Sequence, residues 1–167
     1  MADSFLLDRR DRLTPVDHQT HRRYAFQVPP DCRELRIRVR YAPKFLPREE
    51  STRVATQAVQ DQAASLATRV GEPLAARWRS EMGAIPSRVR IENLVTISLD
   101  DAAGGYRGAG HRHHARQDLI VGLTTASPGL VPGPIPAGQW ALTLSAHTLV
   151  TPQCDVLIQI GAETASS

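Results

Sequence analysis

Apolar and polar residues alternate in several short stretches of the chain, with the period of two that is typical of a half-buried β-strand. The clearest stretch is residues 35–41, where four apolar side chains alternate with three arginines. The same alternation occurs at residues 24–28, 95–99, 140–145 and 154–160. Segments rich in Gly, Pro and Asp, which favour turns, separate these stretches. The pattern predicts a mainly β fold, an antiparallel and jelly-roll-like β-sandwich.

A helical period replaces this alternation in the middle of the chain. Residues 51–70 are rich in Ala and Gln, and their apolar positions fall on one helical stripe. Gly71 suits the end of this helix, and Pro73 suits the first turn of a second helix that runs to Met82. The sequence therefore predicts an inserted α-helical hairpin. Its narrow, alanine-rich stripe would pack on a sheet edge or against a second copy of the chain.

These patterns divide the chain into parts of one domain. Its 167 residues are the usual size of a single domain, so 1–167 is interpreted as one. Residues 1–21 are charged and aperiodic, and we interpret them as a surface arm. The predicted β-sandwich comprises residues 22–46 and 88–162. The helical insertion comprises residues 48–86.

Charge and composition narrow the functional classes. The formal net charge is +3, and arginines at alternate positions 36, 38 and 40 can in principle follow a phosphate backbone. No aromatic residue interleaves them to stack on bases, so we interpret them as an exposed sheet face and do not expect nucleic-acid binding. Cys32 and Cys154 are interpreted as two buried thiols. The chain shows neither an export core nor a membrane-length apolar run, which favours a cytoplasmic protein without membrane contact.

Histidines provide the candidate chemistry. His111 and His113 would share a face of an extended segment, and His147 follows a later strand. Imidazoles that converge at one rim of the sandwich can hold zinc, and they can equally form a polar turn bonded to backbone carbonyls. No serine lies in a Gly-x-Ser-x-Gly motif and no phosphate-binding glycine loop is present. We therefore assign no catalytic residue and expect no cofactor, with zinc as the alternative.

The sequence resembles a known family at these residues. Residues 106–113 read YRGAGHRH, residues 132–140 read PGPIPAGQW, and an apolar strand with His147 follows. This order resembles the β-sandwich domain that precedes the PHP domain in CehA/McbA-type metallohydrolases. Residues 24–30 and 35–41 fit the same pattern. The catalytic metal motif of that family, His-x-His-Thr followed by Ser-Asp-Gly, is absent. The resemblance therefore implies a fold, and it does not imply an activity.

The sequence thus predicts a non-catalytic binding or interaction module. By resemblance it is a stand-alone accessory sandwich that associates with a partner metallohydrolase, or with itself through the helical insertion. The candidate binding residues are Tyr106, Arg107, His111, His113 and His147. One alternative is a metal-dependent hydrolase that uses His111, His113 and His147 as metal ligands. Another is an anion- or carbohydrate-binding β-sandwich.

Overall fold

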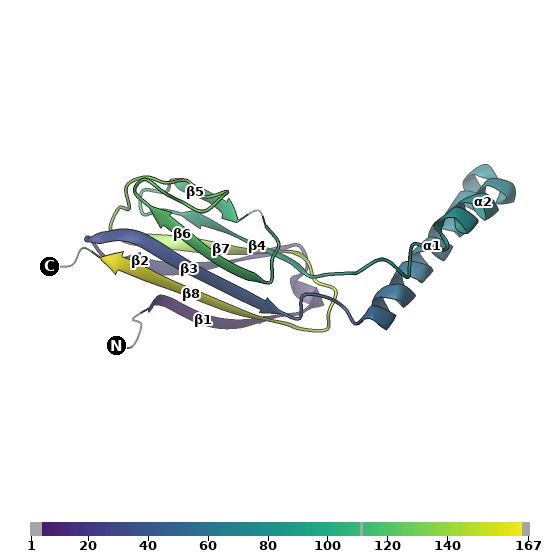
Figure 1. Ribbon diagram of the computed structural model, residues 1–167, viewed down its shortest axis with the longest axis horizontal. Coiled ribbons are helices and arrows are strands. Elements are labelled where there is room, and N and C mark those ends of the chain that lie inside the picture. The colour runs from purple at the N-terminus through teal and green to yellow at the C-terminus, as the bar shows by residue number, and fades with distance from the viewer. Residues whose placement is uncertain (1–4, 111, 165–167) are drawn as a thin grey trace. The chain divides into compact units, whose positions relative to one another are not determined.

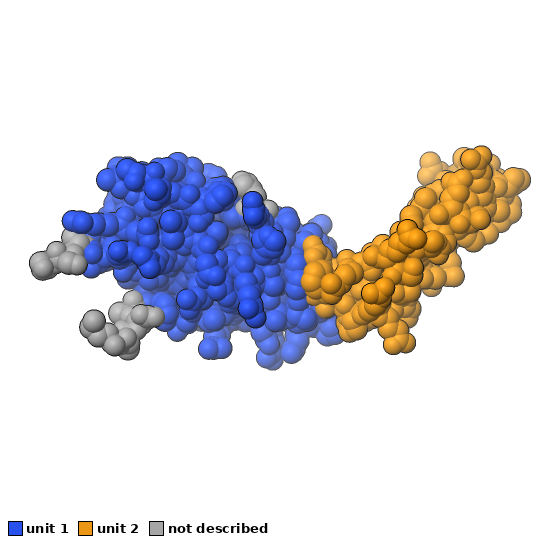
Figure 2. All heavy atoms as spheres, viewed as in Figure 1, with its two compact units in different colours: residues 1–44, 93–167 blue, residues 45–92 orange. Residues whose placement is uncertain are grey.

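The computed structural model describes residues 5–110 and 112–164, and it contains two four-stranded antiparallel sheets and one helical hairpin (Figure 1). The chain divides into two units, coloured separately in Figure 2. Unit 1 consists of Met1–Lys44 and Asn93–Ser167, and unit 2 is Phe45–Glu92. The prediction of a mainly β sandwich with an inserted helical hairpin is confirmed.

Unit 1 holds both sheets. The first sheet has the strand order β1-β8-β3-β6, with β1 Phe5–Leu13, β8 Cys154–Thr164, β3 Cys32–Ala42 and β6 Arg116–Gly122. The second sheet has the order β2-β7-β4-β5, with β2 Thr20–Val28, β7 Gly138–Thr148, β4 Leu94–Asp100 and β5 Tyr106–Gly110. All six neighbouring pairs are antiparallel, as the period-two pattern predicts.

The interpretation of residues 1–21 as a surface arm is corrected by β1. This strand pairs with β8 from Phe5 opposite Gly161 to Leu13 opposite Cys154, and a 3₁₀ turn at Pro15–Asp17 connects it to β2. The period-two pattern did not detect this strand, because charged side chains occupy both of its faces. Asp11 points inward but is satisfied there, since it accepts a hydrogen bond from the Tyr24 hydroxyl at 2.5 Å and pairs with Arg22 at 2.7 Å.

The core lies between the sheets and is mainly aliphatic. The apolar residues of 35–41 are buried as predicted, and the arginines between them face outward. Trp140 is fully buried, as its place after the Pro136–Gly138 turn suggests, and its Nε1 donates a hydrogen bond to the Pro136 carbonyl at 2.8 Å. Cys32 and Cys154 are buried free thiols, which confirms their interpretation.

Unit 2 contains α1, Arg48–Val70, and α2, Glu72–Met82. Gly71 joins them with φ +94°, a backbone conformation that favours glycine, and its amide donates to the Ala67 carbonyl at 3.0 Å. The predicted apolar stripe of residues 51–70 is only partly covered, because Ala63 is buried whereas Val70 is 52% exposed. Among the described residues, no helix is long and apolar enough to cross a membrane.

Candidate functional site

The structure brings together two of the three histidines proposed as metal ligands. The rings of His113 and His147 meet edge to face with their centroids 6.1 Å apart, and His147 Nε2 shares a hydrogen bond of 2.7 Å with the Thr96 hydroxyl. His111 lies outside the described residues. Within residues 5–110 and 112–164, no three or more His, Cys, Asp or Glu side chains are grouped to hold a metal ion.

The other two predicted binding residues, Tyr106 and Arg107, lie side by side at the start of β5 but in opposite environments. The Tyr106 side chain is exposed, whereas Arg107 is buried at 6% exposure. Arg107 donates hydrogen bonds to the carbonyls of the loop before β7, at 3.0 Å to Val131, 3.3 Å to Gly133 and 2.7 Å to Pro134. The guanidinium also lies 3.6 Å from the Asp101 carboxylate. Since its donors are used within the sandwich, Arg107 holds the loop in place.

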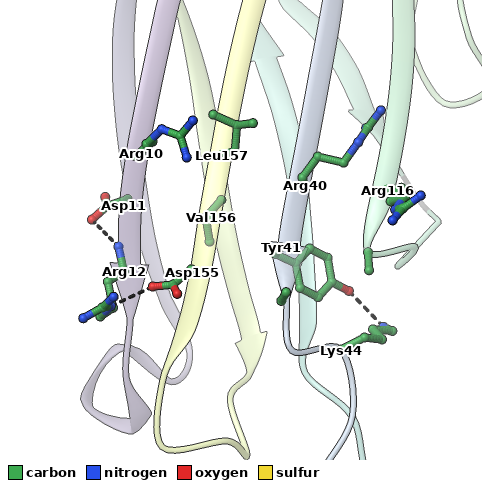
Figure 3. A pocket seen from close by; sticks show the side chains of 12 residues that line it. Arg10, Asp11, Arg12, Arg40, Tyr41, Lys44, Arg116, Asp155, Val156 and Leu157 are labelled. Carbon is green, nitrogen blue, oxygen red and sulfur yellow. Dashed lines mark hydrogen bonds and ion pairs between the residues drawn. The ribbon is translucent and has the colours of Figure 1, made fainter.

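A different site emerges on the outer face of the first sheet. The alternation in β3 turns Arg40 outward, and the register places it opposite Leu157 on β8 and opposite Arg116 on β6. Leu157 in turn lies opposite Arg10 on β1. The four residues form one line across all four strands, which we call the arginine row. Figure 3 shows Arg10 on one side of Leu157 and Arg40 and Arg116 on the other.

A shallow hollow of about 980 Å³ covers the arginine row and the neighbouring strand ends (Figure 3). We call it the basic hollow, because five basic side chains face only two carboxylates there. The basic residues are Arg10, Arg12, Arg40, Lys44 and Arg116, the acidic ones are Asp11 and Asp155, and the rest are Tyr41, Ala42, Ala115, Val156 and Leu157.

Two of the four arginines in the basic hollow are already paired. Arg12 contacts Asp155 at 2.7 Å. Arg40 binds Asp118 through both carboxylate oxygens, at 2.6 and 2.7 Å, and this hydrogen bonding keeps the pKa of Asp118 below its usual value despite partial burial. Arg10 and Arg116 make no ion pair or hydrogen bond within the described part of the chain. Their charges are therefore available to a ligand.

Polar contacts hold the end of the basic hollow in place. Lys44 Nζ donates hydrogen bonds to the Tyr41 hydroxyl and to the Asn93 carbonyl, both at 2.9 Å. The Tyr41 hydroxyl donates to the His113 carbonyl at 2.9 Å. Asp11 adds little negative charge to the hollow, because its carboxylate is turned toward Tyr24 and Arg22. Burial by itself would raise the pKa of Asp11, but the hydrogen bonds from Tyr24 and Arg22 outweigh it and lower the pKa.

A second hollow of about 950 Å³ occupies the other end of the same sheet face. Its charge balance is reversed, because two arginines meet three carboxylates there. Arg36 lies between Glu34 at 3.0 Å and Glu163 at 2.5 Å, and Arg38 lies 3.5 Å from Asp118. The outer face of the first sheet is therefore basic at one end and acidic at the other.

The sequence pattern placed Arg40 on an exposed sheet face but did not indicate a binding site there, and it did not single out Arg10, Arg116 or Leu157. These residues come from strands far apart in the chain, and only the register of the sheet aligns them. The one signal in the sequence was Leu157, an apolar residue at an outward position of an alternating strand.

The comparisons with known proteins leave the chain without an assigned family. No protein-family description matches it, and no curated protein matches it. Among solved structures, it is similar to a protein from Sulfurospirillum deleyianum at 9% sequence identity, over 93% of this chain and 98% of that one, with a TM-score of 0.33. A similarity of this size supports no functional argument.

Proposed function

We propose that the protein is a non-catalytic binding module and that it binds an anionic ligand in the basic hollow. The observation that carries this proposal is that Arg10 and Arg116 have unpaired charges among the described residues. They stand at the two ends of the arginine row without a carboxylate partner in the described residues, whereas Arg12 and Arg40 are both paired.

The spacing of these two arginines suits a ligand held between them. β1 and β6 are separated by three inter-strand spacings, roughly 14 Å. Both side chains are long enough to turn toward the middle of the row, where Leu157 and Arg40 lie. Guanidinium groups form paired, charge-assisted hydrogen bonds with phosphate and carboxylate groups, and a concave surface of one sign raises the local concentration of the opposite ion.

Calorimetric titration with inorganic pyrophosphate at low ionic strength tests the proposal. We expect binding that weakens by about tenfold or more in the double variant Arg10→Ala/Arg116→Ala, since each lost charge-assisted contact contributes on the order of 1 kcal/mol or more. The matched control is Arg53→Ala/Arg77→Ala in the hairpin, which removes the same charge and should bind like the parent. Equal weakening in both double variants would reduce the effect to net charge and contradict a site.

The non-catalytic part of the proposal has its own measurement. Incubation with 4-nitrophenyl phosphate should release no nitrophenolate above the buffer rate, with and without added zinc. Turnover that follows the protein through purification would make the module an enzyme.

The metal-dependent hydrolase is the second candidate, and the contact between His113 and His147 favours it. Its test is the metal content of protein prepared without an affinity tag. Stoichiometric zinc that is lost in His113→Ala, together with phosphoesterase activity lost in the same variant, would replace the proposed function. His21→Ala is a matched control, because His21 bonds Ser145 on the same sheet and belongs to no proposed ligand set.

The sequence resemblance adds a proposal about partners. By that resemblance the module accompanies a PHP-type metallohydrolase. Self-association through the hairpin is the alternative, supported by the 52% exposure of both Val70 and Leu74. Light scattering after gel filtration tests self-association: a dimer that becomes monomeric in Leu74→Glu supports it, and a monomeric parent protein contradicts it.

A further inference from the structure

Resting on the proposed anion site, we infer that the ligand of the basic hollow is a small amphiphilic anion. Its class is a phosphate or carboxylate group carried on an aromatic or aliphatic body. Two features of the outer face lead to this class: the apolar surface inside the basic hollow, and the reversed charge of the neighbouring hollow.

The first feature is the exposed part of Leu157. The outward positions of β8 are otherwise Asp155, Gln159, Gly161 and Glu163, so Leu157 is the one large apolar side chain among them. It is half-buried and lies between Arg10 and Arg40 in the arginine row. A ligand with an apolar body would remove this side chain from water while its anionic group meets the arginines.

The small residues near Leu157 leave room for such a body. Ala42 and Ala115 line the same hollow, and neither has a side chain that extends over the sheet. The hollow therefore combines a low apolar floor with long cationic side chains at its margins. This arrangement holds an anionic head and an apolar body at the same time, and an inorganic ion would use only half of it.

The second feature limits the length of the ligand. A polyanion extended along β8 would pass from the basic hollow into the second hollow, where Glu34, Asp118 and Glu163 outnumber Arg36 and Arg38. Like charges repel there, so each further anionic group of the chain would lose affinity instead of gaining it. The ligand thus carries its charge at one end and stays within the basic hollow.

Calorimetric titrations with four probes test this inference: inorganic phosphate, phenyl phosphate, benzoate and long-chain polyphosphate. We expect phenyl phosphate to bind about tenfold more tightly than inorganic phosphate, because burial of part of a phenyl ring contributes an effect of that order. Benzoate compares a carboxylate head with a phosphate head on the same body. Polyphosphate should bind no more tightly than pyrophosphate.

Leu157→Ser provides the decisive variant. It should bring phenyl phosphate to within about twofold of inorganic phosphate and leave inorganic phosphate unchanged. Val131→Ser, at a half-exposed apolar residue of the loop before β7, is the matched control and should change neither affinity. Leu157 is not part of the buried core, so Leu157→Ser should still fold. Thermal unfolding of each variant checks this.

The outcomes separate the inference from the proposal beneath it. If phenyl phosphate and inorganic phosphate bind equally well to the parent protein, the apolar body is wrong while the anion site stands. If polyphosphate binds more tightly than pyrophosphate, the ligand is a polyanion. If none of the anions binds, the proposed function itself fails.

Discussion

The guanidinium carbon of Arg107 lies over the indole ring of Trp140, 5.2 Å from its centroid. Both residues also bind the loop before β7, Arg107 through the carbonyls of Val131, Gly133 and Pro134 and Trp140 through the carbonyl of Pro136. A cation above a tryptophan face is attracted to it, and more strongly where water is excluded. The stacked pair therefore fastens a proline-rich loop to the core of the sandwich.

The first prediction is that Trp140→Ala destabilises the fold by about 3–5 kcal/mol, the usual range for deleting a large buried aromatic side chain. The reason is that Trp140 is fully buried and packs against Phe26, with ring centroids 6.5 Å apart. Urea denaturation followed by circular dichroism measures the change. Trp78→Ala is the control, since Trp78 in α2 is only half-buried and should contribute less. A loss below about 1 kcal/mol at Trp140 would contradict its place in the core.

The second prediction concerns Arg107→Lys, which keeps the charge but loses the planar fork of donors. One ammonium group cannot reach three carbonyls as a guanidinium does, so some of these part-buried acceptors lose their donor. We expect a loss of about 1–3 kcal/mol in the free energy of unfolding. The control is Arg23→Lys, because Arg23 pairs with Asp100 on the exposed face of the second sheet. If both variants unfold alike, the contacts of Arg107 with the loop contribute little.

The third prediction concerns alkaline pH. Burial, together with the hydrogen bond to the Asp11 carboxylate, raises the pKa of Tyr24 from 10.0 to about 12, and burial raises the pKa of Cys154 from 9.0 to about 11. Folded pKa values above the unfolded ones mean that this stability is fully present below about pH 9. It is lost as pH rises through the folded values. Stability should therefore fall between about pH 9 and pH 12.

Two variants separate the contributions to this alkaline loss. Tyr24→Phe should flatten the part of the profile between about pH 10 and pH 12, and Cys154→Ala the part between about pH 9 and pH 11. Urea midpoints measured across this range give the profile of each protein. Identical pH slopes in the parent and both variants would show that neither group titrates differently in the folded state.

The fourth prediction is that unit 1 folds without the hairpin. The amide of Asn93 donates a hydrogen bond to the Lys44 carbonyl at 2.8 Å, so the two ends of unit 1 are adjacent where Phe45–Glu92 is inserted. Replacing that segment with a short Gly/Ser turn should leave a β protein with a single cooperative denaturant transition. A chain that is unfolded in the buffer where the parent is folded would show that the sandwich depends on the helices.

The sequence predicted those parts of the fold in which side-chain polarity follows the backbone period. Residues 35–41 alternate cleanly, and the proline-glycine turn before Trp140 marks the start of a strand. Both strands could therefore be predicted from the sequence. β1 was not readable, because its inward Asp11 finds partners on β2 that no local pattern reveals. Local patterns report burial only where the buried group is apolar.

The candidate site was less predictable than the fold. Arg10 and Leu157 lie opposite each other although 147 positions separate them in the chain, and only strand register brings them together. Arg107 was predicted to bind a ligand, yet its carbonyl partners lie 24 to 27 residues away in the loop it supports. Exposure and pairing depend on these distant contacts, which no stretch of sequence displays by itself.

The two buried cysteines can report on local opening of the first sheet. In the strand register, Cys32 on β3 lies opposite Thr164 on β8, and Cys154 on β8 lies opposite Leu13 on β1. The two thiols therefore lie at opposite ends of the first sheet. Burial raises the pKa of both thiols and disfavours the reactive thiolate, and a disulfide-exchange reagent must wait for each end to open. Cys32, at 9% exposure, should be labelled before Cys154, at 0%. Two labelling rates, resolved by mass spectrometry, would time the opening of each end of the sheet in the unmodified chain.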